Sequence, residues 1–178
     1  LSHLKGKLAP EIKKYVGEMD LIIIDCPPAM ESDAPAAALL ISDLAIIPVQ
    51  MSFPDVWSTA QAKLLIEKSM MYNPDLKPRF LATMTEDNDN PKTKDRRTAV
   101  EKSCAAAMEE DEVVPMLNTR MRRRNAYRES PAYGQSVHVL ARQKAAVAEV
   151  EAILEEVLEI LGVKVQKPNS KKKKSEVA

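Results

Sequence analysis

The sequence predicts an α/β protein in which a mostly parallel sheet is covered by helices. Residues 21–24 are four branched apolar residues without polar alternation, which suits a strand buried on both faces. Residues 44–49 form a second run of this kind, and segments with helical spacing of apolar residues lie between and after the two runs. Strands that alternate with helices favour a parallel sheet.

The composition is that of one neutral domain. A chain of 178 residues with 45% hydrophobic content can bury one full core, and 26 basic residues balance 26 acidic ones. Cys26 and Cys104 are far apart and lack metal-ligand spacing, so a reduced cytosolic compartment is the simplest fit. No apolar run approaches the ~20 residues that a membrane span needs. We therefore expect a soluble protein.

A carboxylate ends the first apolar run. Asp25 follows residues 21–24 directly, and Pro27 and Pro28 come after it. Open α/β sheets bind ligands at the carboxyl ends of their strands, and an acidic residue that closes an apolar strand commonly holds magnesium in nucleoside triphosphatases. The alternative is a plain turn, because Asp and Pro are frequent turn residues. The local pattern leaves both interpretations open.

The other elements follow from apolar spacing, caps and breakers. The expected elements are, in chain order, a helix at 4–15, a helix with its body at 36–41 capped by Ser32 or Asp33, a helix from 54 to about 72, a strand at 79–84, a helix at 94–108, a strand at 113–117 and a helix at 144–161. The strands at 21–24 and 44–49 should form a right-handed parallel unit with the helix between them. Trp57 is expected in the core, with an exposed contact as the alternative, and Cys104 is expected to be a small buried hydrophobe.

An abrupt change in charge follows the last predicted strand. Residues 119–128 hold five arginines in ten positions. Guanidinium groups suit phosphate because their planar fork can bond it in a bidentate way. The alternative is a solvated basic surface, but only Glu129 lies close enough in sequence to offset the charge. We favour phosphate or nucleic-acid contact.

The end of the chain predicts a domain boundary. Residues 130–134 should break the chain, and Gly162 stands where the C-terminal cap of the helix at 144–161 belongs. Residues 1–162 then form the domain, and residues 163–178 form a lysine-rich tail without core-forming content, for which we expect disorder. Such a tail can attract an anionic polymer, although it is more often a solubilising end.

Three stretches together resemble the ParA/MinD family of partition ATPases, the deviant Walker A group of P-loop (SIMIBI) NTPases. Residues 20–28 (DLIIIDCPP) are similar to the Walker B and switch II segment, and residues 42–50 (SDLAIIPVQ) to the next strand, which ends in Pro-Val in the family. Residues 119–134, which end in RESPAYG, resemble the segment before the last helix of ParA-type members. The resemblance extends to about Gly162 and is specific only when the three stretches are taken jointly.

This resemblance implies a function and a set of partners. It implies an ATPase for plasmid or chromosome partition that uses ATP and Mg²⁺ and forms a homodimer around two nucleotides. In that state it would bind duplex DNA nonspecifically, and a ParB-like centromere-binding or adaptor protein would discharge it. The expected location is the bacterial cytoplasm, in association with the nucleoid and without a membrane partner.

The resemblance also implies roles for residues at matching positions. Asp25 would reach magnesium through water, Pro27 would lie at the nucleotide, and Thr83 and Met84 would lie near the adenine. The DNA backbone would be contacted by Arg120, Arg122, Arg123, Arg124, Arg142 and Lys144. Backbone contacts by arginine and lysine are salt-sensitive and blind to sequence, as binding to bulk chromosome requires.

One departure from the family pattern is severe. The sequence contains no glycine-rich loop with a lysine, and its four glycines are not clustered. Backbone amides of such a loop cradle the nucleotide phosphates. We therefore expect the loop, its lysines and the water-positioning aspartate upstream of Leu1 in a longer parent protein, with a fold incomplete at its N-terminus here. The residues given should not hydrolyse ATP by themselves.

Other interpretations remain open at this stage. A non-hydrolysing DNA-binding or adaptor protein with a degenerate P-loop fold would keep the arginines without the nucleotide loop. A MinD-like membrane-associated regulator should end in an amphipathic helix, whereas Val163 and Val165 are followed by lysines. A reductase like the nitrogenase iron protein needs glycine-flanked cluster cysteines, and Cys26 is not placed that way.

Overall fold

Two parallel strands form the centre of the structure, a computed structural model that describes residues 8–27, 33–86, 97–109, 111–140 and 144–163. Strand β1 (Leu44–Gln50) pairs with β2 (Lys77–Thr83) from Leu44↔Lys77 to Gln50↔Thr83. Helix α3 (Phe53–Met70) connects them. The mixed α/β class, the parallel pairing and the predicted strands near 44–49 and 79–84 are therefore confirmed.

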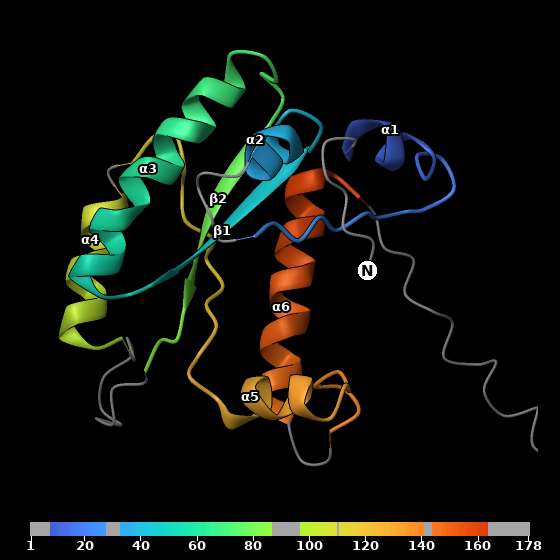
Figure 1. Ribbon diagram of the computed structural model, residues 1–178. Coiled ribbons are helices and arrows are strands. Elements are labelled where there is room, and N and C mark those ends of the chain that lie inside the picture. Colours follow the sequence, from blue (N-terminus) through green and yellow to red (C-terminus); the bar gives the residue numbers. More distant parts are fainter. Residues whose placement is uncertain (1–7, 28–32, 87–96, 110, 141–143, 164–178) are drawn as a thin grey trace, which may run out of the picture.

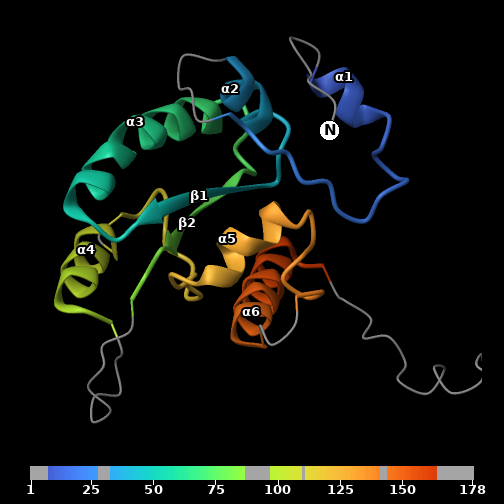
Figure 2. The ribbon, with the colours of Figure 1, turned by 60° about the horizontal axis from the view of Figure 1, so that its bottom comes forward.

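Helices cover the two faces of this small sheet. In Figures 1 and 2, α3 and α4 (Ala99–Glu109) lie on one side of β1 and β2, whereas α5 (Asn125–Ala132) and α6 (Lys144–Leu161) lie on the other. The short helices α1 (Leu8–Lys13) and α2 (Asp33–Leu39) contact each other, and α2 also contacts α3. The arrangement is a sheet between helical layers, as the α/β class requires.

The main core lies between the sheet and the α3–α4 layer. Its fully buried members are Val49, Ile66, Phe80, Met108 and Val114. A second cluster, formed by Ala126, Val137 and Ala146 with Tyr127, Val147 and Val150 packed against it, joins α5 to the first half of α6. The α5–α6 unit therefore has apolar packing of its own.

The predicted strand at 21–24 is not formed. Residues 21–27 have no regular secondary structure, although their exposure alternates from residue to residue as in an extended chain. Leu21 is 41% exposed and Ile23 84% exposed, so the run is not buried on both faces. In the described part of the chain, no strand lies along it: β1 pairs with β2 alone. A strand needs a neighbour for its backbone groups, and here the apolar run lacks one. The predicted parallel unit of 21–24 and 44–49 is wrong for the same reason.

The predicted strand at 113–117 is reduced to isolated bridges. Phe80 bridges to Met116 and Thr85 to Arg122, both in parallel. Between these bridges one side advances by five residues and the other by six, so an extra residue interrupts the ladder as in a bulge. Pro115 contributes no N–H to the pairing. The segment follows β2 without becoming a regular strand.

Two of the longer predicted helices are confirmed along their length, and a third is confirmed in part. Helices α3 and α6 match the expected 54–72 and 144–161, and Cys104 is buried as expected, with a thiol pKa that burial raises. Helix α4 begins only at Ala99, and the part of the prediction at 94–96 lies outside the described residues. Trp57 is 72% exposed, so its placement in the core is wrong.

One helix was not predicted. Residues 130–132, which we expected to break the chain, belong to α5, and Pro131 stands in its last turn. Ala126, 1% exposed, packs against α6 and stabilises this short helix despite its proline. Apart from Val163, the lysine-rich tail lies outside the described residues.

The core assignment can be tested with two aromatic residues. We expect Phe80→Ala to lower the free energy of unfolding by about 3–5 kcal/mol, because Phe80 is 1% exposed and its loss leaves a cavity. Tyr72→Ala is the matched control: Tyr72 is 80% exposed, and a change within about 0.5 kcal/mol is expected. Denaturant unfolding measures both. If the two variants lost equal free energy of unfolding, Phe80 would not be a core residue.

Candidate functional site

The carboxyl edge of the sheet is the first candidate site. Gln50 and Thr83 are register partners at this edge, and the Thr83 hydroxyl donates to the carbonyl oxygen of Val49 (3.2 Å). Met84, the next residue, has φ of 53° and is the only described non-glycine residue with a positive φ. A methionine in this region is uncommon, and such backbone positions are enriched at functional sites. Thr83 and Met84 thus lie together at the strand end where ligands of α/β sheets bind.

A cavity of about 350 Å³ opens beside this strand end. Ala82 and Thr85, which flank Thr83 and Met84, are among its lining residues. Its other lining residues include apolar side chains of the 115–117 segment, the cations Arg97 and Arg120, and the carboxylates of Glu101 and Glu109. The cavity therefore combines an apolar wall with charged side chains of both signs.

Asp25 lies in the unpaired extended segment, not at the end of a sheet strand. Its side chain is solvent-exposed, and Pro27 is exposed as well. Among the described residues, no group of three or more His, Cys, Asp or Glu side chains could hold a metal ion. Magnesium is usually bound by one or two carboxylates together with water and substrate phosphates. Asp25 thus fits one ligand position and does not form a metal site alone.

The second candidate site is the arginine segment, residues 120–124, whose backbone lies along β2. The N–H of Met121 donates to the carbonyl oxygen of Ala82 (2.8 Å), and the N–H of Arg123 to that of Thr85 (2.9 Å). In return the N–H of Thr85 donates to the carbonyl oxygen of Met121 (3.1 Å). These bonds hold the segment extended, so successive side chains point in opposite directions.

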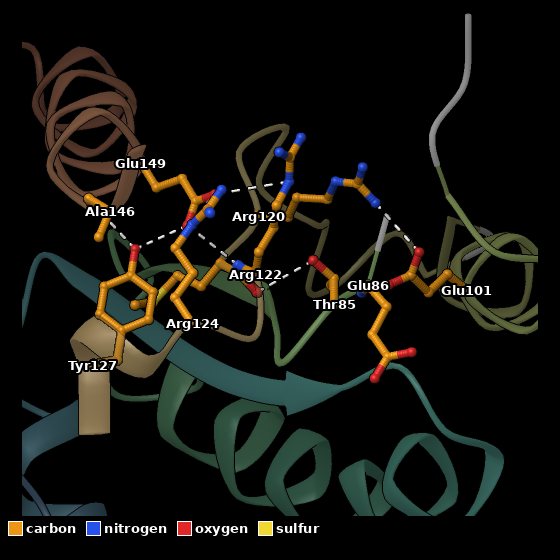
Figure 3. A network of polar contacts seen from close by, with 10 residues as sticks. Thr85, Glu86, Glu101, Arg120, Arg122, Arg124, Tyr127, Ala146 and Glu149 are labelled. Atoms are coloured by element: carbon orange, nitrogen blue, oxygen red, sulfur yellow. Dashed lines mark hydrogen bonds and ion pairs between the residues drawn. The ribbon is translucent and has the colours of Figure 1, made fainter. Parts of the chain in front are cut away.

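Glu149 of α6 gathers the side chains on one side of the arginine segment (Figure 3). Arg124 donates from Nε to Glu149 Oε1 (2.9 Å) and from Nη2 to the same oxygen (2.5 Å). Arg122 Nε lies 3.7 Å from Oε1, and its backbone N–H donates to Oε2 (3.3 Å). The hydroxyl of Tyr127 donates to Oε2 as well (2.9 Å). One carboxylate thus binds two arginines and a tyrosine.

The pKa of Glu149 reflects this environment. Burial opposes ionisation, but the hydrogen bonds from Arg124, Tyr127 and the Arg122 backbone outweigh it and lower the pKa of this carboxyl. Burial and the neighbouring carboxylate raise the pKa of Tyr127 far above its usual range, so its hydroxyl stays protonated. Glu149 is therefore an anion at neutral pH.

Glu101 of α4 performs a similar role for Arg120. Arg120 Nη1 lies 3.3 Å from Glu101 Oε2, and the carboxylate also accepts the backbone N–H groups of Glu86 (2.7 Å) and Thr98 (2.9 Å). The N–H of Glu101 donates in turn to Thr98 Oγ1 (3.2 Å), which completes a capping box at the start of α4. The pattern Thr-x-x-Glu at 98–101 is a sequence signal that could have located this helix start.

Two of the remaining predicted DNA contacts, Arg123 and Lys144, are more open to solvent. Arg123 pairs with Glu86 at 3.4 Å, and the two side chains are 65% and 62% exposed. Lys144, the first residue of α6, is exposed. Arg142 lies outside the described residues. Arg128 on α5, which we did not assign to the site, is exposed too.

The fold therefore offsets much of the positive charge of the arginine segment. From the sequence, only Glu129 was close enough to offset the arginines. In the fold, Glu86, Glu101 and Glu149 come from three distant parts of the chain and each pairs with at least one of them. No periodicity in the sequence predicts these partners, because the glutamates and the arginines come together only when α4 and α6 pack around β2.

A neighbouring turn is held on α6 in the same way. Glu156 accepts the backbone N–H groups of Asn118 (2.6 Å) and Thr119 (2.8 Å). Burial opposes ionisation of Glu156, but these bonds outweigh it and lower its pKa. Two carboxylates two turns apart on α6 thus fix the path of residues 118–124.

Fold and site define an α/β protein with a ligand-sized cavity at the carboxyl edge of a parallel sheet and a carboxylate-bound arginine segment beside it. No known family model matches the chain. The chain is similar to a curated protein, "Maintenance of carboxysome distribution protein A" from Halothiobacillus neapolitanus, with 32% identity over 140 residues. The match covers 78% of this chain, and the chain spans 60% of the length of that relative. Within the described residues, no helix is long and apolar enough to cross a membrane.

The role of Glu149 can be tested by its pH dependence. Its folded-state pKa is lowered, so its stabilisation is present above the unfolded value of about 4.5 and is lost as the pH falls through the folded value. We expect Glu149→Gln to lower the free energy of unfolding by about 1–3 kcal/mol at pH 7, with the difference from the unmodified protein shrinking below pH 4.5.

Glu155→Gln is the control for this experiment. Glu155 lies on the same helix and is exposed, so its substitution should leave the stability curve nearly unchanged. Denaturant unfolding across a pH series measures both variants. A constant deficit of Glu149→Gln at all pH values would show that shape, not charge, holds the arginine segment.

Proposed function

We propose that this chain is part of a ParA-like positioning ATPase and that the intact protein binds ATP with Mg²⁺. The observation that carries the proposal is the similarity over 78% of the chain to a protein named for maintaining carboxysome distribution. The family resemblance of the motifs and the parallel α/β fold also support it. On this basis the cargo is a large cellular body, as in that relative, or a plasmid or chromosome.

The nucleotide would be held at the carboxyl edge of the sheet. Thr83 and Met84 would lie near the adenine, at the strand end beside the cavity that their neighbours Ala82 and Thr85 line. Asp25 would contribute one carboxylate to magnesium through water, with Pro27 beside it. Bound ATP would supply the phosphoanhydride, and its phosphates would need a glycine-rich loop that the given sequence does not contain. Hydrolysis is therefore proposed for the intact protein.

The same protein would bind duplex DNA without sequence preference and dimerise around nucleotide. The proposed DNA contacts are the arginine segment, Arg142 and Lys144. Arginine and lysine contacts to phosphate give the salt-sensitive binding that a protein using bulk chromosome as a track requires. A centromere-binding or adaptor protein would stimulate hydrolysis and release the DNA.

A non-hydrolysing DNA-binding or adaptor protein is the second candidate. It is favoured by one observation: Asp25 is exposed, and among the described residues it belongs to no group of three or more carboxylate, thiolate or imidazole side chains that could hold a metal ion. The two candidates differ in whether the intact protein hydrolyses ATP.

The ATPase proposal predicts a specific effect of Asp25. In the intact protein, with any sequence encoded upstream of Leu1 included, Asp25→Asn should lower the rate of ATP hydrolysis by about 100-fold or more, because the magnesium carboxylate is lost. Asp20→Asn, an exposed carboxylate of the same segment, should leave the rate within about twofold. Phosphate release measures both rates. An intact protein with no hydrolysis, or an Asp25→Asn variant as active as the unmodified protein, would favour the adaptor.

The DNA-binding proposal predicts an effect of charge reversal. Replacing Arg122, Arg123 and Arg124 by Glu in the intact protein should weaken duplex binding at least tenfold and flatten its salt dependence, because the positive charge of the segment that faces the phosphates is reversed. A triple Glu variant of the exposed residues Lys13, Lys14 and Lys68 changes the net charge equally and should bind nearly as the unmodified protein does. Fluorescence anisotropy across a salt series measures this. Unchanged binding by the arginine variant would assign the arginines to another role.

A further inference from the structure

We propose that four of the five arginines in residues 119–128 divide into two classes: Arg122 and Arg124 are positioning residues that fasten the arginine segment to α6 through Glu149, whereas Arg123 and Arg128 contact the phosphates. This inference rests on the proposed DNA binding and names the residues that carry it. It assigns a phosphate contact to Arg128, which the motif resemblance did not include. It also removes two of the expected contacts from the DNA surface.

The first step is the geometry of the positioning class. The side chain of Glu149 is 13% exposed, and those of Arg124 and Arg122 are 25% and 35% exposed. Arg124 uses both Nε and Nη2 on this carboxylate, which occupies one of the two edges through which a guanidinium can bind phosphate in a bidentate way. A nucleic-acid phosphate that took this edge would displace a carboxylate whose side chain is 13% exposed and leave it unpaired, which is costly.

The second step is the different surroundings of the contact class. Arg123 points away from Glu149, as the alternation of an extended segment requires, and its side chain is 65% exposed. Its partner Glu86 is 62% exposed, so this ion pair is screened by water and weak. A phosphate can replace Glu86 without burying an unpaired charge.

Arg128 is presented by the helix that follows. Ala126 of α5 is buried against α6, and a residue two positions later is rotated by about 200° around a helix, so Arg128 lies opposite the packed face. Arg128 is exposed, and within the described part of the chain no carboxylate forms an ion pair with it. The packing of Tyr127 and Ala126 on α6 fixes this helix and hence the position of the guanidinium.

The test compares single substitutions in the intact protein. The binding assay uses a duplex of arbitrary sequence with ATP and Mg²⁺ over a series of salt concentrations, and thermal melting is recorded without DNA. Arg123→Gln and Arg128→Gln should each reduce the slope of log affinity against log salt by about 0.9 and leave the melting temperature unchanged. Arg124→Gln should leave the slope unchanged and lower the melting temperature by several degrees.

Arg124→Lys provides the conservative variant, since it keeps the charge and loses the fork. A positioning role predicts a lowered melting temperature with an unchanged slope, even if Arg124→Gln fails to fold. The assignment is overturned if Arg124→Gln lowers the slope as Arg123→Gln does, or if the Arg123 and Arg128 variants bind with the original slope. A lack of duplex binding by the unmodified protein would overturn both this inference and the proposed DNA binding, whereas binding with the reverse pattern would overturn this inference alone.

Discussion

The ion pairs between the arginine segment and the acidic residues of α4 and α6 are the constraint on which the candidate site depends. The backbone of the segment lies along β2, but its side chains are held by Glu101 and Glu149 from opposite helical layers. Each carboxylate also accepts backbone N–H groups. Burying them without their arginines would leave unpaired charge, so the helices and the segment stabilise one another's positions.

A second constraint is that a β-strand forms only where a neighbouring strand can pair with its backbone. The apolar run 21–24 has the composition of a buried strand, yet Ile23 is 84% exposed where no described strand lies beside it. Similarly, the segment after Val114 follows β2 but loses the ladder through one extra residue. Apolar composition indicates that a segment can form a strand, and the presence of a pairing partner decides whether the strand forms.

The sequence located Thr83 and Met84 at the end of a strand, and their contact with a nucleotide stays a prediction. Thr83 and Met84 lie at the carboxyl edge of a parallel strand because β1, α3 and β2 follow from local apolar spacing. Asp25 was predicted at such an edge and lies in an unpaired segment instead. The partners of the arginines could not be predicted, because Glu149 is 25 residues from Arg124 in sequence and becomes its neighbour only when α6 packs beside β2.

By itself the sequence determined the α/β class, the two long helices, the existence of the strands β1 and β2 and the concentration of arginines after the last predicted strand. These features depend on interactions within a few turns of the chain, so residue spacing is enough to specify them. The tertiary structure alone decided which arginines are held by carboxylates and which face water. That outcome depends on long-range packing, which determines both the distance between opposite charges and the burial that gives their pairing its strength.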